Sequence, residues 1–403
     1  MSRIRVYIKP FKDDGEYGDF IEVTDDVDIN GVSSIRASID STEYDAGVFK
    51  FSNFTIKLAN ESGRYSDVDV FQSIFRTRRN DSIVRVTWDP NAFDDAVAGL
   101  HVLGENETTV FEGLLSDDAT KLNLKDQKIN FQCLGYESLL ERTEVPFSSL
   151  SVGNTFEQIV KTCLDQAPFN THITVSASNI SCGTNLASDA IADLENQTVK
   201  EAMDEILIVS NSVLYIDSGV VYVTDRTPSA TTQYTFYGQA SDDGIENIAN
   251  ITNFRTGVNR VKNLLTWEDT NEAEFDQTSK DNYGVRKKQV SSGLITNATK
   301  KRTILSNFRD EFKNAKQELD LDSTLNIGRV KLSLLDKVEI DYPTVFVPAD
   351  DGDLPLWGRV SWGNFRYPVG QWSATISTDT EWKVIQIKYN LTKGTLSYKL
   401  REV

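Results

Sequence analysis

The chain has 403 residues, of which 39% are hydrophobic and 25% charged, and its formal net charge is −18. This length and composition predict a folded protein of two to four domains, each large enough to bury its own core. The acidic balance argues against a duplex-binding protein, which needs a basic face. The densest basic clusters, at residues 76–79 and 300–302, are too short to supply one.

Three cysteines, Cys133, Cys163 and Cys182, show no paired spacing. This odd count argues against a disulfide framework and fits assembly in a reducing compartment. The N-terminal residues lack the apolar core of a signal peptide, and no apolar run in the sequence approaches the ~20 residues of a membrane helix. We therefore expect no stable membrane insertion.

Residues 1–145 are predicted to form strands. Polar and apolar residues alternate with a period of two, which is typical of half-buried strands, and Gly, Asn and Asp separate the runs. These runs occupy residues 3–8, 34–40, 49–58, 82–88 and 128–134. The spacing favours an antiparallel barrel or sandwich.

Residues 146–226 change to a helical pattern. Asn154–Glu157 resembles a capping box, Thr198–Glu201 is a regular one, and an apolar stripe at helical spacing follows each. Residues 212–224 have the pattern of two short strands joined by a turn, which indicates a hairpin. The segment is therefore predicted to be a compact α+β domain.

Residues 227–298 are expected to connect the domains through strands and loops. Near their end, Tyr283-Gly284-Val285-Arg286 predicts a turn, because glycine tolerates a positive φ. We interpret Tyr283, Gly284 and Arg286 as a structural hinge at which the chain returns to build a second β-rich domain.

An amphipathic helix is predicted between Thr299 and Leu319. Its apolar face consists of Ile304, Leu305, Phe308, Phe312, Ala315 and Leu319. The cations at 300–302 lie near the helix start, where the helix dipole disfavours positive charge. They indicate either an acidic neighbour or a solvated end.

Alternation over residues 320–403 again predicts strands, including a terminal hairpin.

The sequence contains little that indicates catalysis. Neither His101 nor His172 has a histidine partner at ligand spacing, and zinc needs several ligands in one place. The acidic run 350–353 lacks the spacing of a calcium loop and is interpreted as a turn. No nucleophile turn or phosphate loop is present in the sequence. We expect no cofactor, no metal site and no catalytic residue.

Two features leave a glycan-directed role open. Paired carboxylates for glycoside cleavage need only meet in space, so the sequence does not decide their presence. Four tryptophans in the C-terminal part could form a sugar platform or fill the core of a small barrel. They are Trp357, Trp362, Trp372 and Trp382.

The order of these elements resembles the hub proteins of phage tail baseplates and tail tips. This family includes the contractile-phage baseplate hub and the N-terminal part of siphophage tail-associated proteins. The resemblance covers nearly the whole chain and depends on the order and spacing of its parts. The best-matching pieces are 113–143, 198–225, 282–286, 335–343 and 382–403.

The resemblance implies a mainly β, multidomain fold with two tail-tube-like β-barrel domains and a smaller α+β insert. The implied parts are an N-terminal tube-like barrel (1–145), the α+β insert (146–226), connecting strands and loops (227–298), and a helix with the second barrel (299–403). Some members carry an enzymatic C-terminal extension. This chain ends at Val403, directly after the predicted hairpin, so we expect it not to be an enzyme.

The resemblance also implies partners and a location. Three subunits would form a ring that joins the hexameric tail tube or distal tail protein above to a spike or fibre protein below. DNA would pass the enclosed channel without specific binding, and a tape measure protein is a further possible partner. The protein would assemble in the host cytoplasm and reside in the virion tail.

Two alternatives stay open. One is a carbohydrate-binding or glycan-degrading tail protein, which would use the C-terminal tryptophans and some of the 60 acidic residues. The other is the hub of a non-phage contractile injection system, which sequence does not separate from a phage hub.

Overall fold

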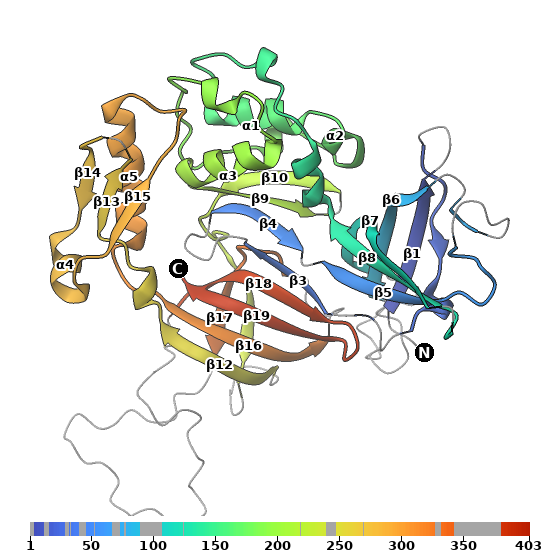
Figure 1. The fold of residues 1–403 in the computed structure, drawn as a ribbon. Coiled ribbons are helices and arrows are strands. Elements are labelled where there is room, and N and C mark those ends of the chain that lie inside the picture. The colour runs from blue at the N-terminus through green and yellow to red at the C-terminus, as the bar shows by residue number, and fades with distance from the viewer. Residues whose placement is uncertain are drawn as a thin grey trace, which may run out of the picture.

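The computed structural model of the chain is mainly β, as expected, with helices gathered over one part of it (Figure 1). Two sheets follow one another along the molecule, and a smaller sheet lies at the end opposite the first. The structure describes residues 4–11, 16–28, 32, 34–39, 46–51, 53–66, 73–75, 78–88, 107–123, 125–217, 219–238, 247–268, 270–326, 332–341 and 380–403.

The first sheet is antiparallel throughout the strand pairs described. Its strands run in the order β2 (Ile21–Glu22), β1 (Ile4–Phe11), β6 (Arg78–Trp88), β7 (Thr108–Asn123), β8 (Lys128–Gly135) and β5 (Phe54–Ala59). In β1 and β8 buried residues alternate with half-buried ones along the whole strand, as the period-two pattern predicts.

The second sheet combines strands from distant parts of the chain. Its order is β10 (Val220–Asp225), β9 (Ser212–Asp217), β4 (Gly47–Phe51), β3 (Ile35–Ile39), β18 (Trp382–Asn390), β19 (Thr395–Glu402), β16 (Gln317–Asn326) and β12 (Ile248–Thr256). A side branch is formed by β11 (Thr232–Tyr237), which pairs with β17 (Lys337–Asp341), and β17 also pairs with β18.

This pairing differs from the prediction that the strands of residues 1–145 all belong to one barrel. β3 pairs with β18, and β4 pairs with β3 and β9, so both lie in the second sheet. Alternation identifies a strand but carries no information about its partner. One apolar cluster contains buried side chains of both sheets, among them Phe111, Phe131, Trp382 and Tyr398. The apolar cores of the two sheets are therefore continuous.

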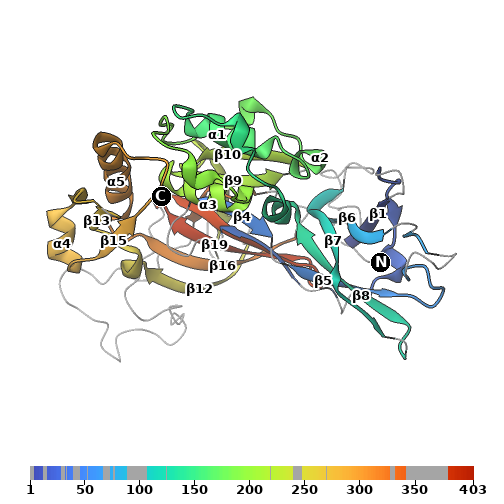
Figure 2. The same cartoon turned by 45° about the horizontal axis from the view of Figure 1, so that its top comes forward.

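The helical layer lies over the β9–β10 hairpin (Figure 2). It contains α1 (Phe156–Leu164), α2 (Phe169–His172) and α3 (Val199–Val209). The predicted capping box at Thr198–Glu201 and the hairpin are confirmed. The box before α1 lies one residue later than predicted, because Thr155 caps the helix and exchanges hydrogen bonds with Gln158.

The smaller sheet has the order β14 (Ala273–Phe275), β13 (Leu264–Trp267) and β15 (Lys287–Val290). Between β14 and β15 the chain forms α4 (Gln277–Tyr283). Helix α5 (Ala298–Phe312) packs on β13 and β14 rather than on the second sheet. Short 3-10 helices cover Thr24–Asp26, Tyr136–Arg142, Phe147–Ser149, Ala177–Asn179, Ala192–Leu194 and Val258–Arg260.

Helix α5 is shorter than predicted. Ile304, Leu305, Phe308 and Phe312 form its buried face, but the helix ends at Phe312. Leu319 continues the helical spacing by coincidence and belongs to β16, where Leu319 and Leu321 are both buried on the same side of the strand.

The cations at the start of α5 do have acidic neighbours. Lys300 Nζ lies 2.5 Å from Asp189 Oδ1, and Arg302 pairs with Glu272. Asp189 also accepts hydrogen bonds from the backbone N–H groups of Thr296 and Asn297. Of the two interpretations of residues 300–302, the acidic neighbour is therefore the one confirmed.

Within the described residues, no helix combines the length and apolar character needed to span a membrane. Cys133, Cys163 and Cys182 are buried free thiols. Trp382 is fully buried and fills the core, whereas Trp357, Trp362, Trp372 and the run 350–353 lie outside the described residues.

Candidate functional site

The three predicted hinge residues lie together at the C-terminal end of α4. The side chain of Asp276 caps the start of the helix by accepting a 2.8 Å hydrogen bond from the N–H of Ser279. At its end, Gly284 donates its N–H to the carbonyl of Lys280 and adopts φ +72° and ψ 175°. This backbone region is essentially restricted to glycine, so the predicted turn at Gly284 is present.

Asn263, which the sequence analysis did not identify, holds this turn in place. It is fully buried, and its Nδ2 donates to the Gly284 carbonyl at 2.8 Å and to Ser279 Oγ at 3.2 Å. Its Oδ1 accepts from the N–H of Arg286 at 2.8 Å. One buried amide thus satisfies the carbonyl of Gly284 and the N–H of Arg286 and also binds the side chain of Ser279 in α4.

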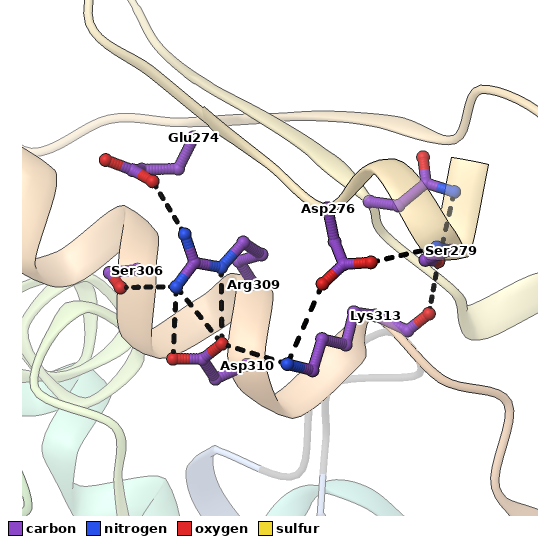
Figure 3. Close-up of polar contacts among 8 residues, drawn as sticks. Glu274, Asp276, Ser279, Ser306, Arg309, Asp310 and Lys313 are labelled. Carbon is purple, nitrogen blue, oxygen red and sulfur yellow. Dashed lines mark hydrogen bonds and ion pairs between the residues drawn. The ribbon is translucent and has the colours of Figure 1, made fainter. Parts of the chain in front are cut away.

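Side-chain contacts tie α5 to β14 and to the start of α4, as Figure 3 shows. Ser279 Oγ donates to the carbonyl of Lys313, directly after the helix. Lys313 Nζ lies 3.7 Å from Asp276 Oδ2, and Arg309 Nη1 lies 2.8 Å from Glu274 Oε2. These contacts fasten α4, β14 and α5 into one unit. Movement of Tyr283, Gly284 and Arg286 as a hinge stays a prediction.

Within the described residues, the smaller sheet is covered by a helix on one face only. The side chains of Leu265, Trp267, Glu274 and Val290 belong to the face on which α5 packs. The opposite side, which we call the open face, consists of Leu264, Thr266, Ala273, Phe275, Lys287 and Gln289. Phe275 is 53% exposed there, although large aromatic side chains contribute most when they are buried.

A buried charge cluster lies where the second sheet meets the segment after α5. Glu318 is 1% exposed and pairs with Arg401, Arg260 and Arg255 at 2.6, 2.6 and 2.9 Å. Burial lowers the pKa of Arg401 to about 10. Burial, partly offset by Glu311, lowers the pKa of Lys383 to about 7. Glu318 and Arg401 are tolerated in the interior because they are paired and hydrogen-bonded to each other.

A second buried carboxylate lies at the junction of the two sheets. Glu137 lines a cavity of about 100 Å³ between β4, β7 and the β9–β10 hairpin. Its Oε1 accepts a 2.7 Å hydrogen bond from the N–H of Phe51 in β4. Burial raises its pKa to about 7, against the opposing effect of its backbone hydrogen bonds.

The histidine described by the structure has a packing role. His172 lies between two tyrosines, with Tyr17 Oη 3.1 Å from its Nδ1 and the Tyr136 ring stacked at 6.2 Å. His101 lies outside the described residues. Across the part of the chain that is described, no group of three or more His, Cys, Asp or Glu side chains is arranged to hold a metal ion.

No family model matches this chain, and no curated protein matches it in sequence. Solved structures do match it over almost its whole length. The tail protein from Neisseria meningitidis MC58 is 12% identical with a TM-score of 0.55, and the match covers 99% of this chain and 96% of that one.

Two prophage proteins give similar results. The 43 kDa tail protein of prophage MuSo2 from Shewanella oneidensis is 12% identical with a TM-score of 0.51, covering 99% of this chain and 98% of that one. Prophage tail protein gp18 from Listeria monocytogenes EGD-e is 11% identical with a TM-score of 0.52, covering 98% and 94%. The resemblance to phage tail proteins is thus confirmed at the level of the fold, which this chain shares with all three.

Proposed function

We propose that the chain is a structural protein of a phage tail, located in the baseplate or tail tip of the virion. The observation that carries this proposal is the fold shared with three tail proteins over at least 98% of the chain. Because fold alone does not define function, the proposal needs its own test. We propose no enzymatic role, and the packing of His172 between two tyrosines supports this view.

In this proposal each of the two large sheets forms one tail-tube-like barrel domain. Residues 146–226 are the α+β insert, and residues 227–298 connect it to the second barrel. The continuous apolar core between the sheets supports a fixed, side-by-side arrangement of the barrels. Two elements are assigned differently from these boundaries in our proposal. β3 and β4 belong to the second barrel, since they pair within the second sheet, and α5 belongs with the smaller sheet on which it packs.

Three copies would place six similar barrels around a channel, which matches the symmetry of a hexameric tail tube. The ring would join the tube or distal tail protein to a spike or fibre protein, with the tape measure protein as a further partner. DNA would pass through without specific binding. A net charge of −18 supports this role, because an acidic surface repels phosphates.

Imaging of the purified chain, with mass measurement over a range of concentrations, tests the proposal. We expect particles of three subunits with three-fold symmetry and a central hole. Compact monomers at every concentration, both alone and with the tail tube protein of the same genome, would contradict the ring.

The alternatives have separate tests. Trp382 is buried and is not available to a glycan, so a sugar platform would depend on the other tryptophans. Specific glycan binding by the purified chain would favour that role. Neighbouring genes for a capsid and terminase would favour a phage over a non-phage injection system.

A further inference from the structure

The open face of the smaller sheet has the chemistry of a contact surface. Phe275 and Leu264 are directly paired across β14 and β13, and Leu264 is in turn paired with Lys287 of β15. Val285, which precedes β15 by two residues, is 66% exposed. Exposed apolar residues that gather at one place, rather than singly, indicate an interaction site.

The α4–β15 side of this face is basic, although the chain as a whole is acidic. Residues 277–288 contain Lys280, Arg286, Lys287 and Lys288 but a single acidic residue, Asp281. Lys280 Nζ lies 4.1 Å from the centre of the Phe275 ring. In the described part of the chain, Lys280, Arg286 and Lys287 form no ion pair with a carboxylate. We call the open face together with these three cations the basic tip.

An acidic segment lies at the opposite end of the molecule. Residues 16–28 contain six carboxylates and no Lys or Arg. Asp28 is paired with Lys57 and Lys128 of the first sheet, and Asp26 with Arg64 in the loop after β5. Three further carboxylates are exposed in or beside β2, the terminal strand of that sheet, and we call them the acidic edge: Asp19, Glu22 and Asp25.

Figures 1 and 2 both place α4 and β15 at one end of the molecule and the first sheet at the other. A contact between two different surfaces of identical copies is heterologous, and it builds a closed ring when the rotation between copies closes. Surfaces of opposite charge at opposite ends favour this head-to-tail arrangement and disfavour tip-to-tip or edge-to-edge contacts.

We infer that the basic tip of one copy binds the acidic edge of a second copy of this chain, with Phe275 and Val285 buried at the centre of the contact. This inference rests on the proposed ring and assigns its subunit interface. The cations steer and orient the encounter, whereas the apolar side chains at the centre supply most of the binding energy.

Charge reversal at each end tests the contact. One variant carries Lys280→Glu and Lys287→Glu, and another carries Asp19→Lys and Glu22→Lys. Each should raise the dissociation constant between copies about tenfold or more at low salt. In an equimolar mixture, the acidic tip of the first variant can meet the basic edge of the second. The two variants together should therefore associate more tightly than either variant alone. Rising salt should reduce both effects.

Lys161→Glu is the matched control, because Lys161 is exposed on α1, away from both ends. Phe275→Ser should weaken association with little salt dependence. Melting temperatures equal to that of the wild type ensure that any loss reflects assembly rather than folding.

The outcomes separate this inference from the proposed function. Trimers that survive both charge reversals would overturn the tip-to-edge contact and leave the ring standing. If trimers of the Lys280→Glu, Lys287→Glu variant form but fail to enter tails, the tip binds another tail protein instead of a second copy. A wild-type chain that stays monomeric at every concentration, both alone and with the tail tube protein, would contradict the ring and this contact together.

Discussion

The side chain of Asn263 donates a 2.8 Å hydrogen bond to the backbone carbonyl of Gly284, 21 residues further along the chain. Its carbonyl oxygen accepts from the N–H of Arg286, which lies on the other side of the turn. The start of β13 and the end of α4 are therefore held together by one buried amide. The turn that the sequence suggested as a hinge is fastened in this conformation.

Asn263→Ala should lower the free energy of unfolding by about 2 kcal/mol or more, because it leaves buried backbone groups without their partner. Chemical denaturation measures this loss. Asn282→Ala is the control, since Asn282 is exposed on α4, and it should change stability by less than about 0.5 kcal/mol. Equal stabilities for the two variants would show that Asn263 does not hold the turn.

Replacing Gly284 by alanine or valine should cost about 1–3 kcal/mol through backbone strain at φ +72°. An added Cβ would meet no atom within 4 Å, so the loss for alanine reflects backbone strain rather than crowding. The β-branched valine should lose at least as much. Thermal melts of both, with Asn282→Ala at an exposed position of α4 as a control, check this expectation. Normal melting temperature and soluble yield would disprove the need for glycine.

Leu305→Asp and Phe308→Asp should each destabilise the chain by about 4 kcal/mol or more, since both side chains are buried under α5 and an ionised carboxylate there has no partner. Thr303→Asp changes an exposed position of the same helix and should be nearly neutral. Unfolding curves that do not distinguish the two positions would mean that α5 does not bury this face in the isolated subunit.

Glu137 should make stability depend on pH between about 4.5 and 7. Burial raises its pKa to about 7, so the folded chain holds this proton more tightly than the unfolded chain. The resulting stabilisation is complete below the unfolded pKa and is lost as pH rises through 7, a change of about 3 kcal/mol.

The comparison of wild type with Glu137→Gln isolates this contribution from other carboxylates. The free energy of unfolding of the wild type minus that of the variant should be larger at pH 4.5 than at pH 8. Nearby Lys50 and Glu141 act in opposite directions on the pKa of Glu137. Glu195→Gln, at an exposed position that is not among these neighbours, is the control. A constant difference between wild type and variant across this pH range would refute the assignment.

Glu318→Gln should cost about 3–5 kcal/mol, because it removes the carboxylate that faces the buried guanidinium of Arg401. Asp322→Asn makes the same chemical change at an exposed position of β16 and should have little effect. Denaturation midpoints compare the two directly. A small loss at Glu318 would mean that other groups in the cluster compensate its charge.

The sequence predicted those features whose determinants are local. Period-two alternation identified β1 and β8, the Thr198–Glu201 box located α3, and the glycine turn at 284 is present. Each depends on residues a few positions apart.

Features that depend on distant residues were missed or misplaced. The pairing of β3 with β18, the hydrogen bonds of Asn263 and the packing of α5 on the smaller sheet all join separated segments. The start of the run 263–267 offered one usable signal. Asn263 stands directly before the four residues of β13, two of which are buried. Burying its amide costs free energy unless the amide has hydrogen-bond partners, so an asparagine at this place indicates a structural role.

The position of β3 between β4 and β18 has a consequence for biosynthesis. During translation, β3 emerges early, but its neighbour β18 is made only near residue 390. Until β18 is made, the N–H and C=O groups on one edge of the nascent β3 strand lack their partners. An unpaired strand edge favours aggregation and chaperone binding. Pairing across some 350 residues gives a high contact order, and we expect slow post-translational completion of this sheet.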